Sequence, residues 1–195
     1  LAYSAQSENE LGSVNELFEQ QCLDLSRTPR VWDNGQAWPC LVSDVPFRDR
    51  YTAVKSLDTR LATPPEGNTQ FIYAISASQV LVAWRGTEMN GLADLSTDVT
   101  FRPVKPEVAA NCDPKVPCAD LVPEGSVHLG FRDAFEIARR TYAEDLGKTI
   151  YEEAEMKDLF ICGHSLGGAL GLIHATSLKE RNPLLYTYGM PRTFT

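Results

Sequence analysis

The chain has 195 residues, a formal net charge of −8 at pH 7 and a hydrophobic content of 43%. This size predicts one globular domain, and no apolar run is long enough to cross a membrane. The acidic balance and the absence of any Lys/Arg cluster argue against nucleic acid as a partner and against electrostatic docking on anionic lipid. The chain begins at Leu1 without a basic, apolar leader, so we expect any targeting segment to have been removed or never to have existed.

Residues 1–70 are predicted to form an N-terminal helix followed by an irregular cover. Ser13 and Glu16 form a capping box, and apolar residues then recur at helical spacing, which predicts a helix over 13–26. Residues 27–50 are rich in Pro, Trp and Asp, so we expect irregular packing over the core there.

The middle of the chain contains strand, loop and helix patterns. Two short apolar runs, 71–75 and 80–84, are separated by a few polar or small residues and predict an antiparallel hairpin. Residues 104–126 are rich in proline and lack periodicity, so they predict a long loop. Apolar residues at spacings of three and four then predict one long amphipathic helix over 131–156.

Residues 163–168, with the sequence GHSLGG, form the most informative stretch. They follow a buried apolar run that predicts a strand, in which Cys162 is expected to be a small core residue. An apolar helix from 166 to about 180 and a strand over 184–188 are predicted after them. This order of strands and helices implies parallel strands with crossover helices, and hence an α/β fold.

This stretch has the G-x-S-x-G pattern of a nucleophile elbow, in which a serine lies on a strained turn between a strand and a helix. Gly163 and Gly167 allow the strand and the helix to approach closely. The hydroxyl of Ser165 would then face a substrate, and the helix that begins at Leu166 would direct free N–H groups at a developing oxyanion. The alternative is a structural Gly-Ser turn.

The partners that such a serine needs are missing from the sequence that follows it. In α/β-hydrolases the nucleophile is followed by an acid and then by a histidine. After Leu166 the chain has no Asp, and its only acid and histidine, Glu180 and His174, occur in the reverse order. We therefore expect this chain to hold the nucleophile half of a hydrolase site, with the acid and the base in sequence beyond Thr195.

None of the three histidines is predicted to be the general base. His174 lies on the helix after the serine and is expected to pack on one of its faces, pointing away from Ser165. His164 is expected to pack or hydrogen-bond beneath the turn, and His128 to have a structural role near the site.

The cysteines leave two alternatives open. Cys112 and Cys118 could close a small disulfide ring, and Cys22 and Cys40 could pair across the N-terminal segment, as in an oxidising compartment. Alternatively all five cysteines are reduced, because spacing does not establish proximity. No metal site is predicted, because no C-x-x-C motif is present and the histidines are scattered.

Five blocks together resemble the class 3 (fungal-type) lipase family, in the order and approximate spacing of that family. They are VAWRGT at 82–87, DLSTDVTF at 94–101, VHLGF at 127–131, GHSLGG at 163–168 and YTYGMPR at 186–192. The resemblance implies an α/β-hydrolase fold, with a mostly parallel central sheet and flanking helices, incomplete at the C-terminus. It also implies one lipase-like catalytic domain over 1–195, with its core at 71–195.

The resemblance also assigns roles to individual residues. Ser165 would be the nucleophile, and Leu166 and Thr87 would form the oxyanion hole. Asp98 would anchor Thr87, with Gly163, His164 and Gly167 as supporting residues of the elbow. Thr87 could instead belong to a plain turn, and Asp98 could be a surface or helix-capping acid.

Residues 89–95 fall where the family has its lid. Their leucines, methionine and glycine suit a short amphipathic flap that opens on a lipid surface. The tryptophan of the family lid is absent, and the spacing from Thr87 to Asp98 is longer than usual, so interfacial activation does not follow from the sequence.

These observations predict a serine carboxyl-ester hydrolase that acts on acyl lipids, as a triacylglycerol lipase or a phospholipase A1, without a cofactor. The expected partners are a lipid ester and a lipid interface, together with the missing C-terminal segment. Secretion is expected, and the range of the family includes an antibacterial lipase with a cognate inhibitor protein. The alternatives are a non-lipid esterase on the same fold and a catalytically incomplete binding fragment.

Overall fold

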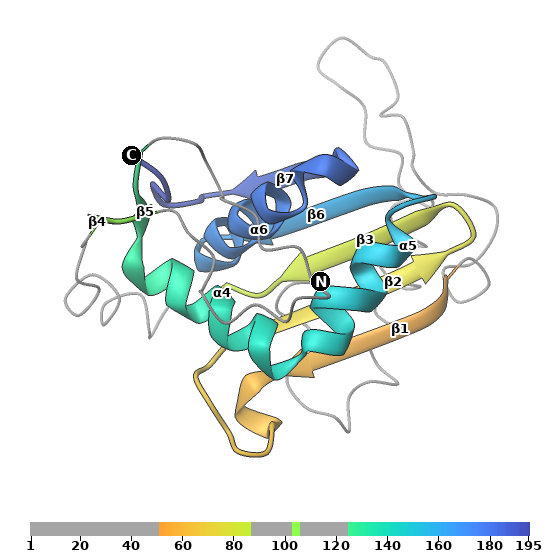
Figure 1. Cartoon of the computed structure of the whole chain (residues 1–195), viewed down its shortest axis with the longest axis horizontal. Helices are drawn as coiled ribbons and strands as arrows, with labels where there is room; N and C mark the ends of the chain where they lie inside the picture. The colour runs from red at the N-terminus through yellow and green to blue at the C-terminus, as the bar shows by residue number, and fades with distance from the viewer. Residues whose placement is uncertain (1–50, 87–102, 106–124) are drawn as a thin grey trace, which may run out of the picture.

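The computed structural model describes residues 51–86, 103–105 and 125–195 (Figure 1). Several predicted segments lie outside these ranges: the helix over 13–26, the cover over 27–50, the lid at 89–95 and most of the loop over 104–126. The four cysteines proposed to form disulfides lie outside them as well.

A mixed five-stranded sheet forms the centre of the described structure, in the order β1-β2-β3-β6-β7 (Figure 1). Its strands are β1 (Tyr51–Asp58), β2 (Gln70–Ser76), β3 (Gln79–Trp84), β6 (Asp158–His164) and β7 (Leu184–Tyr188). The first three pair antiparallel, whereas β3, β6 and β7 pair parallel. The predicted hairpin and the predicted parallel half of the sheet are both confirmed.

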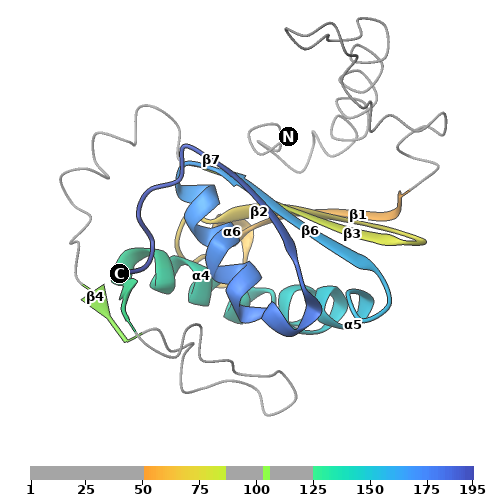
Figure 2. The ribbon, with the colours of Figure 1, turned by 90° about the horizontal axis from the view of Figure 1, so that it is seen from above.

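The helices described here cover one face of this sheet, as Figure 2 shows. They are α4 (Leu129–Thr141), the π-helix η3 (Ala143–Thr149), α5 (Ile150–Glu153) and α6 (Leu166–Ser177). The short 3₁₀ helices η2 (Thr59–Leu61) and η4 (Lys179–Arg181) follow β1 and α6. None of the helices in the described ranges is long and apolar enough to cross a membrane.

A small second sheet joins β4 (Pro103–Val104) to β5 (Val127–His128). The end of the chain lies beside it, since the N–H of Ser126 donates to the carbonyl of Thr195 at 3.1 Å. The predicted loop over 104–126 begins one residue too early, because Val104 is part of β4 and pairs with Val127.

The main core lies between the sheet and these helices. Alternate residues of the central strands face it, and helix residues at spacings of three and four meet them. Its fully buried large side chains are Phe71, Tyr73, Trp84, Phe135, Ile150, Leu159, Ile161, Leu170, Ile173 and His174. A smaller cluster around Ile72 and Ala74 lies on the opposite face of the sheet.

The prediction of one continuous α-helix over 131–156 is wrong, because the helical segment is interrupted by a π-helical stretch. The helix stops at Tyr142, where φ is −118° and ψ is 48°, and continues as the π-helix η3. The buried Asp145 in this π-helix accepts hydrogen bonds from the Tyr73 hydroxyl at 2.6 Å and from Lys55 Nζ at 2.8 Å. We attribute the change of pitch to these contacts, because they fasten one point of the helical segment to β1 and β2.

Candidate active site

Ser165 lies on a sharp turn between β6 and α6. Its φ of 53° and ψ of −126° define a backbone conformation that residues other than glycine rarely adopt. The turn is held from both sides: the N–H of Ser165 donates to the carbonyl of Tyr188 at 2.9 Å, and its carbonyl accepts from the N–H of Gly168 at 2.9 Å. The predicted order of strand, tight turn and helix is present in full.

The two glycines of the motif allow backbone to touch backbone at this turn. A Cβ on Gly163 would lie 2.1 Å from the carbonyl oxygen of Gly167. A Cβ on Gly167 would lie 2.2 Å from the carbonyl oxygen of Trp84, at the end of β3. Both distances are well inside van der Waals contact, so only glycine allows α6 to start against these two strands.

The first turn of α6 places free backbone donors beside the serine. The N–H groups at the start of an α-helix have no intrahelical acceptor and carry a partial positive charge. Leu166 is the first residue of α6, directly after Ser165, which is 8% exposed. The arrangement can stabilise an anion that forms on a group bound to the serine oxygen.

The remaining residues of the predicted site are not within the described part of the chain. Thr87 and Asp98 both lie in the range 87–102. The structure describes the chain up to Gly86, which is buried, and the N–H of Arg85 donates to the carbonyl of Gln70 at 2.9 Å. The strand end that leads into Thr87 is therefore fixed, and the roles of Thr87 and Asp98 remain predictions.

Two of the histidines are buried in structural positions. His174 is 1% exposed, and its Nδ1 accepts a hydrogen bond from Trp84 Nε1 at 3.2 Å. Complete burial lowers the pKa of His174 to about 3. His128 is 7% exposed and stacks on Phe131 with ring centroids 4.3 Å apart, and burial lowers its pKa as well. Both therefore have the structural roles that were predicted for them.

Two expectations about the end of β6 need correction. The packing alternative for His164 is wrong, because this residue is exposed, and Cys162 is half-buried rather than a core residue. Both follow from the alternation of the strand: Leu159 and Ile161 face the helices, so Cys162 and His164 lie on the opposite face. Burial still raises the pKa of the Cys162 thiol, which disfavours its thiolate.

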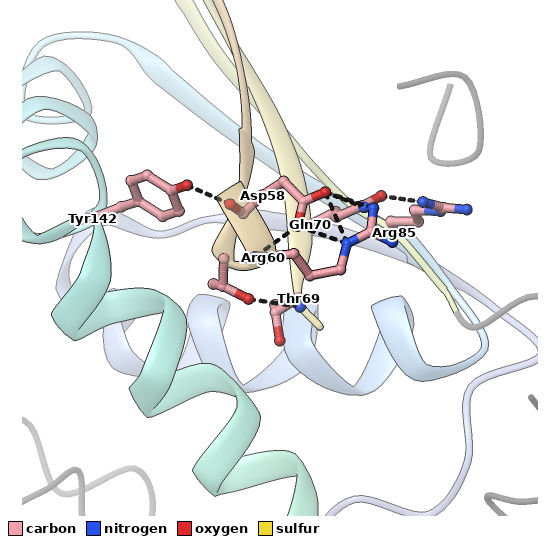
Figure 3. Close-up of polar contacts among 7 residues, drawn as sticks. Asp58, Arg60, Thr69, Gln70, Arg85 and Tyr142 are labelled. Carbon is pink, nitrogen blue, oxygen red and sulfur yellow. Dashed lines mark hydrogen bonds and ion pairs between the residues drawn. The ribbon is translucent and has the colours of Figure 1, made fainter. Parts of the chain in front are cut away.

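A polar network close to this turn was not predicted from the sequence. The side chains of Asp58, Gln70 and Arg85 form a row of hydrogen bonds across the ends of three strands (Figure 3). The sequence indicates this network only through a polar residue at each strand end. Many strands end in a polar residue before a turn, so this signal does not identify a network. No group of three potential metal ligands occurs among the described residues.

Residues 81–195, which include this turn and its neighbouring strands, match the family described as lipase (class 3). The chain belongs to the class 3 lipase family. The predicted family and the α/β-hydrolase fold class are thereby confirmed.

Individual relatives include a lipase and a toxin. The chain is 26% identical to a lipase of Rhizomucor miehei over 188 residues, which are 92% of this chain and 46% of that protein. It is 32% identical over 142 residues, 68% of this chain and 19% of the other, to a protein of Vibrio cholerae named Toxin TseL. The chain thus spans less than half of the length of either relative.

Solved lipase structures share the fold. A fungal lipase in an inhibitor complex superposes with a TM-score of 0.52 at 25% identity, covering 96% of this chain and 63% of that one. The Lip2 lipase of Yarrowia lipolytica gives a TM-score of 0.52 at 22% identity, covering 93% and 62%. The chain therefore shares the fold of these lipases over part of their length.

Proposed function

We propose that this chain carries the nucleophile half of a serine carboxyl-ester hydrolase that acts on acyl lipids. The observation that carries the proposal is the strained backbone of Ser165 between β6 and α6, with Gly163 and Gly167 in backbone contact beside it. This is the geometry that a nucleophile elbow requires. Membership of the class 3 lipase family supports a lipid ester as the substrate, either a glyceride or a phospholipid cleaved in the A1 manner.

In this mechanism the Ser165 hydroxyl gives its proton to the histidine base while its oxygen attacks the ester carbonyl. The tetrahedral intermediate then expels the alcohol, which takes up that proton, and leaves an acyl-enzyme. The N–H groups of Leu166 and Thr87 stabilise the oxyanion of the tetrahedral intermediate, and Asp98 anchors Thr87. Water then releases the fatty acid. The acid and the histidine base of the triad are assigned to sequence after Thr195, because His174 and His128 are buried in other contacts and His164 lies next to the serine on the strand.

A fluorophosphonate probe tests this assignment. The probe phosphonylates an activated serine, so we expect an adduct on Ser165 in a form of the protein that extends beyond Thr195, and none after Ser165→Ala. A clear adduct in the longer form but none in residues 1–195 would support the assignment of the base to the later sequence. The absence of an adduct in both forms would refute the hydrolase and favour a catalytically inactive binding fragment.

Nitrophenyl esters of increasing chain length test the substrate class. A lipase prefers acyl chains of eight or more carbons, because an apolar groove binds them. A strong preference for acetate would contradict the lipid substrate and favour a non-lipid esterase. Comparing triglyceride with phosphatidylcholine vesicles, by released fatty acid, would then distinguish the lipase from the phospholipase.

The similarity to Toxin TseL favours a more specific form of the proposal, in which the protein is an exported antibacterial lipase with a cognate inhibitor protein. Expression directed to the periplasm of a susceptible bacterium tests it. We expect growth arrest that Ser165→Ala abolishes, and unimpaired growth with the unchanged protein would contradict it.

A further inference from the structure

Three side chains at the ends of three neighbouring strands form a hydrogen-bonded row, at the end of the sheet where Ser165 lies (Figure 3). Asp58 ends β1, Gln70 begins β2 and Arg85 follows β3 directly. Gln70 Nε2 donates to Asp58 Oδ2 at 2.5 Å, and Arg85 Nη1 donates to Gln70 Oε1. The amide of Gln70 is thus used at both ends, as donor to a carboxylate and as acceptor from a guanidinium.

The outer end of this row is itself anchored. Asp58 accepts hydrogen bonds from Arg60 Nη2 at 2.6 Å and from the Arg60 backbone N–H at 2.9 Å. Burial would raise the pKa of Asp58, but the hydrogen bonds and the charge of Arg60 outweigh it, so the pKa lies below its usual value. The Asp58 carboxylate is therefore ionised at neutral pH and fixes the orientation of the Gln70 amide.

The inner end of the row holds a segment of backbone next to the serine turn. Gln70 contacts Arg85 twice, through its side-chain oxygen and through its carbonyl, which accepts the Arg85 N–H at 2.9 Å. The same segment supports α6, because a Cβ on Gly167 would lie 2.7 Å from the carbonyl carbon of Arg85. Thr87, the proposed oxyanion donor, follows two residues later.

We propose that Gln70, oriented by Asp58, is a positioning residue for the oxyanion hole, because it fixes the Arg85 backbone against which α6 begins and thereby places the N–H of Leu166. This inference rests on the proposed function. Gln70 is 5% exposed and acts through Arg85 rather than on a substrate. A donor that acts on a transition state must be held to within a fraction of an ångström, and a displacement of about 1 Å can cost about 100-fold in rate.

The test is ester hydrolysis by Gln70→Met, in a form of the protein that extends beyond Thr195. Methionine keeps the length of the side chain and removes both hydrogen bonds. We expect kcat to fall about 10- to 100-fold while KM changes less than about twofold, because the oxyanion forms only in the transition state. The rate of phosphonylation of Ser165 should fall by a similar factor. Asp58→Asn, which keeps the shape but removes the charge, should give a smaller loss of kcat.

Tyr142→Phe is the matched control. It removes the hydrogen bond that the Tyr142 hydroxyl donates to the Asp58 carbonyl at 2.6 Å, but it leaves the side chains of the row in place. We expect this variant to lower thermal stability while kcat stays within about twofold. A purely structural row would instead lower stability in Gln70→Met and Asp58→Asn without changing kcat, and that result would overturn the proposal. If Gln70→Met does not fold, an unchanged kcat in Asp58→Asn overturns it alone.

The two proposals fail differently. If the unchanged protein neither hydrolyses esters nor reacts with the fluorophosphonate probe at Ser165, the proposed function fails, and the role of Gln70 fails with it. If the unchanged protein is active and the Gln70 and Asp58 variants match it in kcat, only the role of Gln70 fails.

Discussion

Replacing Gly167 with alanine tests whether backbone contact at the serine turn determines the packing of α6. The new Cβ would lie 2.2 Å from the carbonyl oxygen of Trp84 and 2.7 Å from the carbonyl carbon of Arg85. Carbon and oxygen normally stay more than 3.0 Å apart, and these neighbours are backbone atoms that cannot rotate away. The start of α6 must therefore move away from β3, by close to 1 Å.

The expected cost follows from two opposing effects. Alanine favours a helix over glycine by about 1 kcal/mol, whereas forcing extra volume into a packed site typically costs about 1–3 kcal/mol and more against rigid backbone. We expect Gly167→Ala to lower the free energy of unfolding by about 2 kcal/mol, the upper end of that cost less the gain in helix propensity. The measurement is urea denaturation followed by tryptophan fluorescence, since Trp84 is fully buried at this contact.

Gly171→Ala on the same helix is the control. Its Cβ would lie 3.5 Å from Ile161 Cγ2 and 3.6 Å from Leu185 Cδ1, which are ordinary contacts. The same substitution should therefore be neutral here or stabilise the protein by up to about 1 kcal/mol. Equal stability of the two variants would refute the argument from backbone contact.

Two further predictions concern buried titratable groups. Because burial lowers the pKa of His174 to about 3 from its usual 6.5, the unfolded chain takes up a proton there first as the pH falls. The unchanged protein should therefore lose free energy of unfolding relative to His174→Gln below pH 6.5, by up to about 1.4 kcal/mol per pH unit. Urea titrations at several pH values measure this difference, and a difference independent of pH would contradict the prediction. Asp145→Asn should cost about 1–3 kcal/mol, because it weakens the buried hydrogen bonds from Tyr73 and Lys55. It should also bring the pKa of Tyr73, raised to about 12 by burial and then by Asp145, closer to its usual value in an ultraviolet titration, and an unchanged value would count against the contact.

The elements that local sequence determines could be predicted. The hairpin of β2 and β3, the strand β6 and the helix after Ser165 each consist of a compact apolar run bounded by glycine or polar residues. The turn at Ser165 could be predicted because Gly163 and Gly167 allow a close approach between neighbouring residues of the chain, and this contact is local.

The features that the sequence did not predict depend on contacts between distant residues. The π-helical stretch follows from the contact of Asp145 with Tyr73, which lies 72 positions away in the sequence. The row of Asp58, Gln70 and Arg85 exists only because three strand ends meet at one edge. Neither contact could be predicted from the spacing of apolar residues, since each of these residues looks like an ordinary polar position in the sequence.

The backbone at Ser165 has a consequence for how this protein could change over time. A residue with a side chain held at φ 53° and ψ −126° carries strain of about 1–3 kcal/mol, which glycine would avoid. Selection for stability alone would therefore favour losing the serine at the one position where the proposed reaction requires it. In the proposed chemistry the hydroxyl at this position is gained at the expense of a more stable fold.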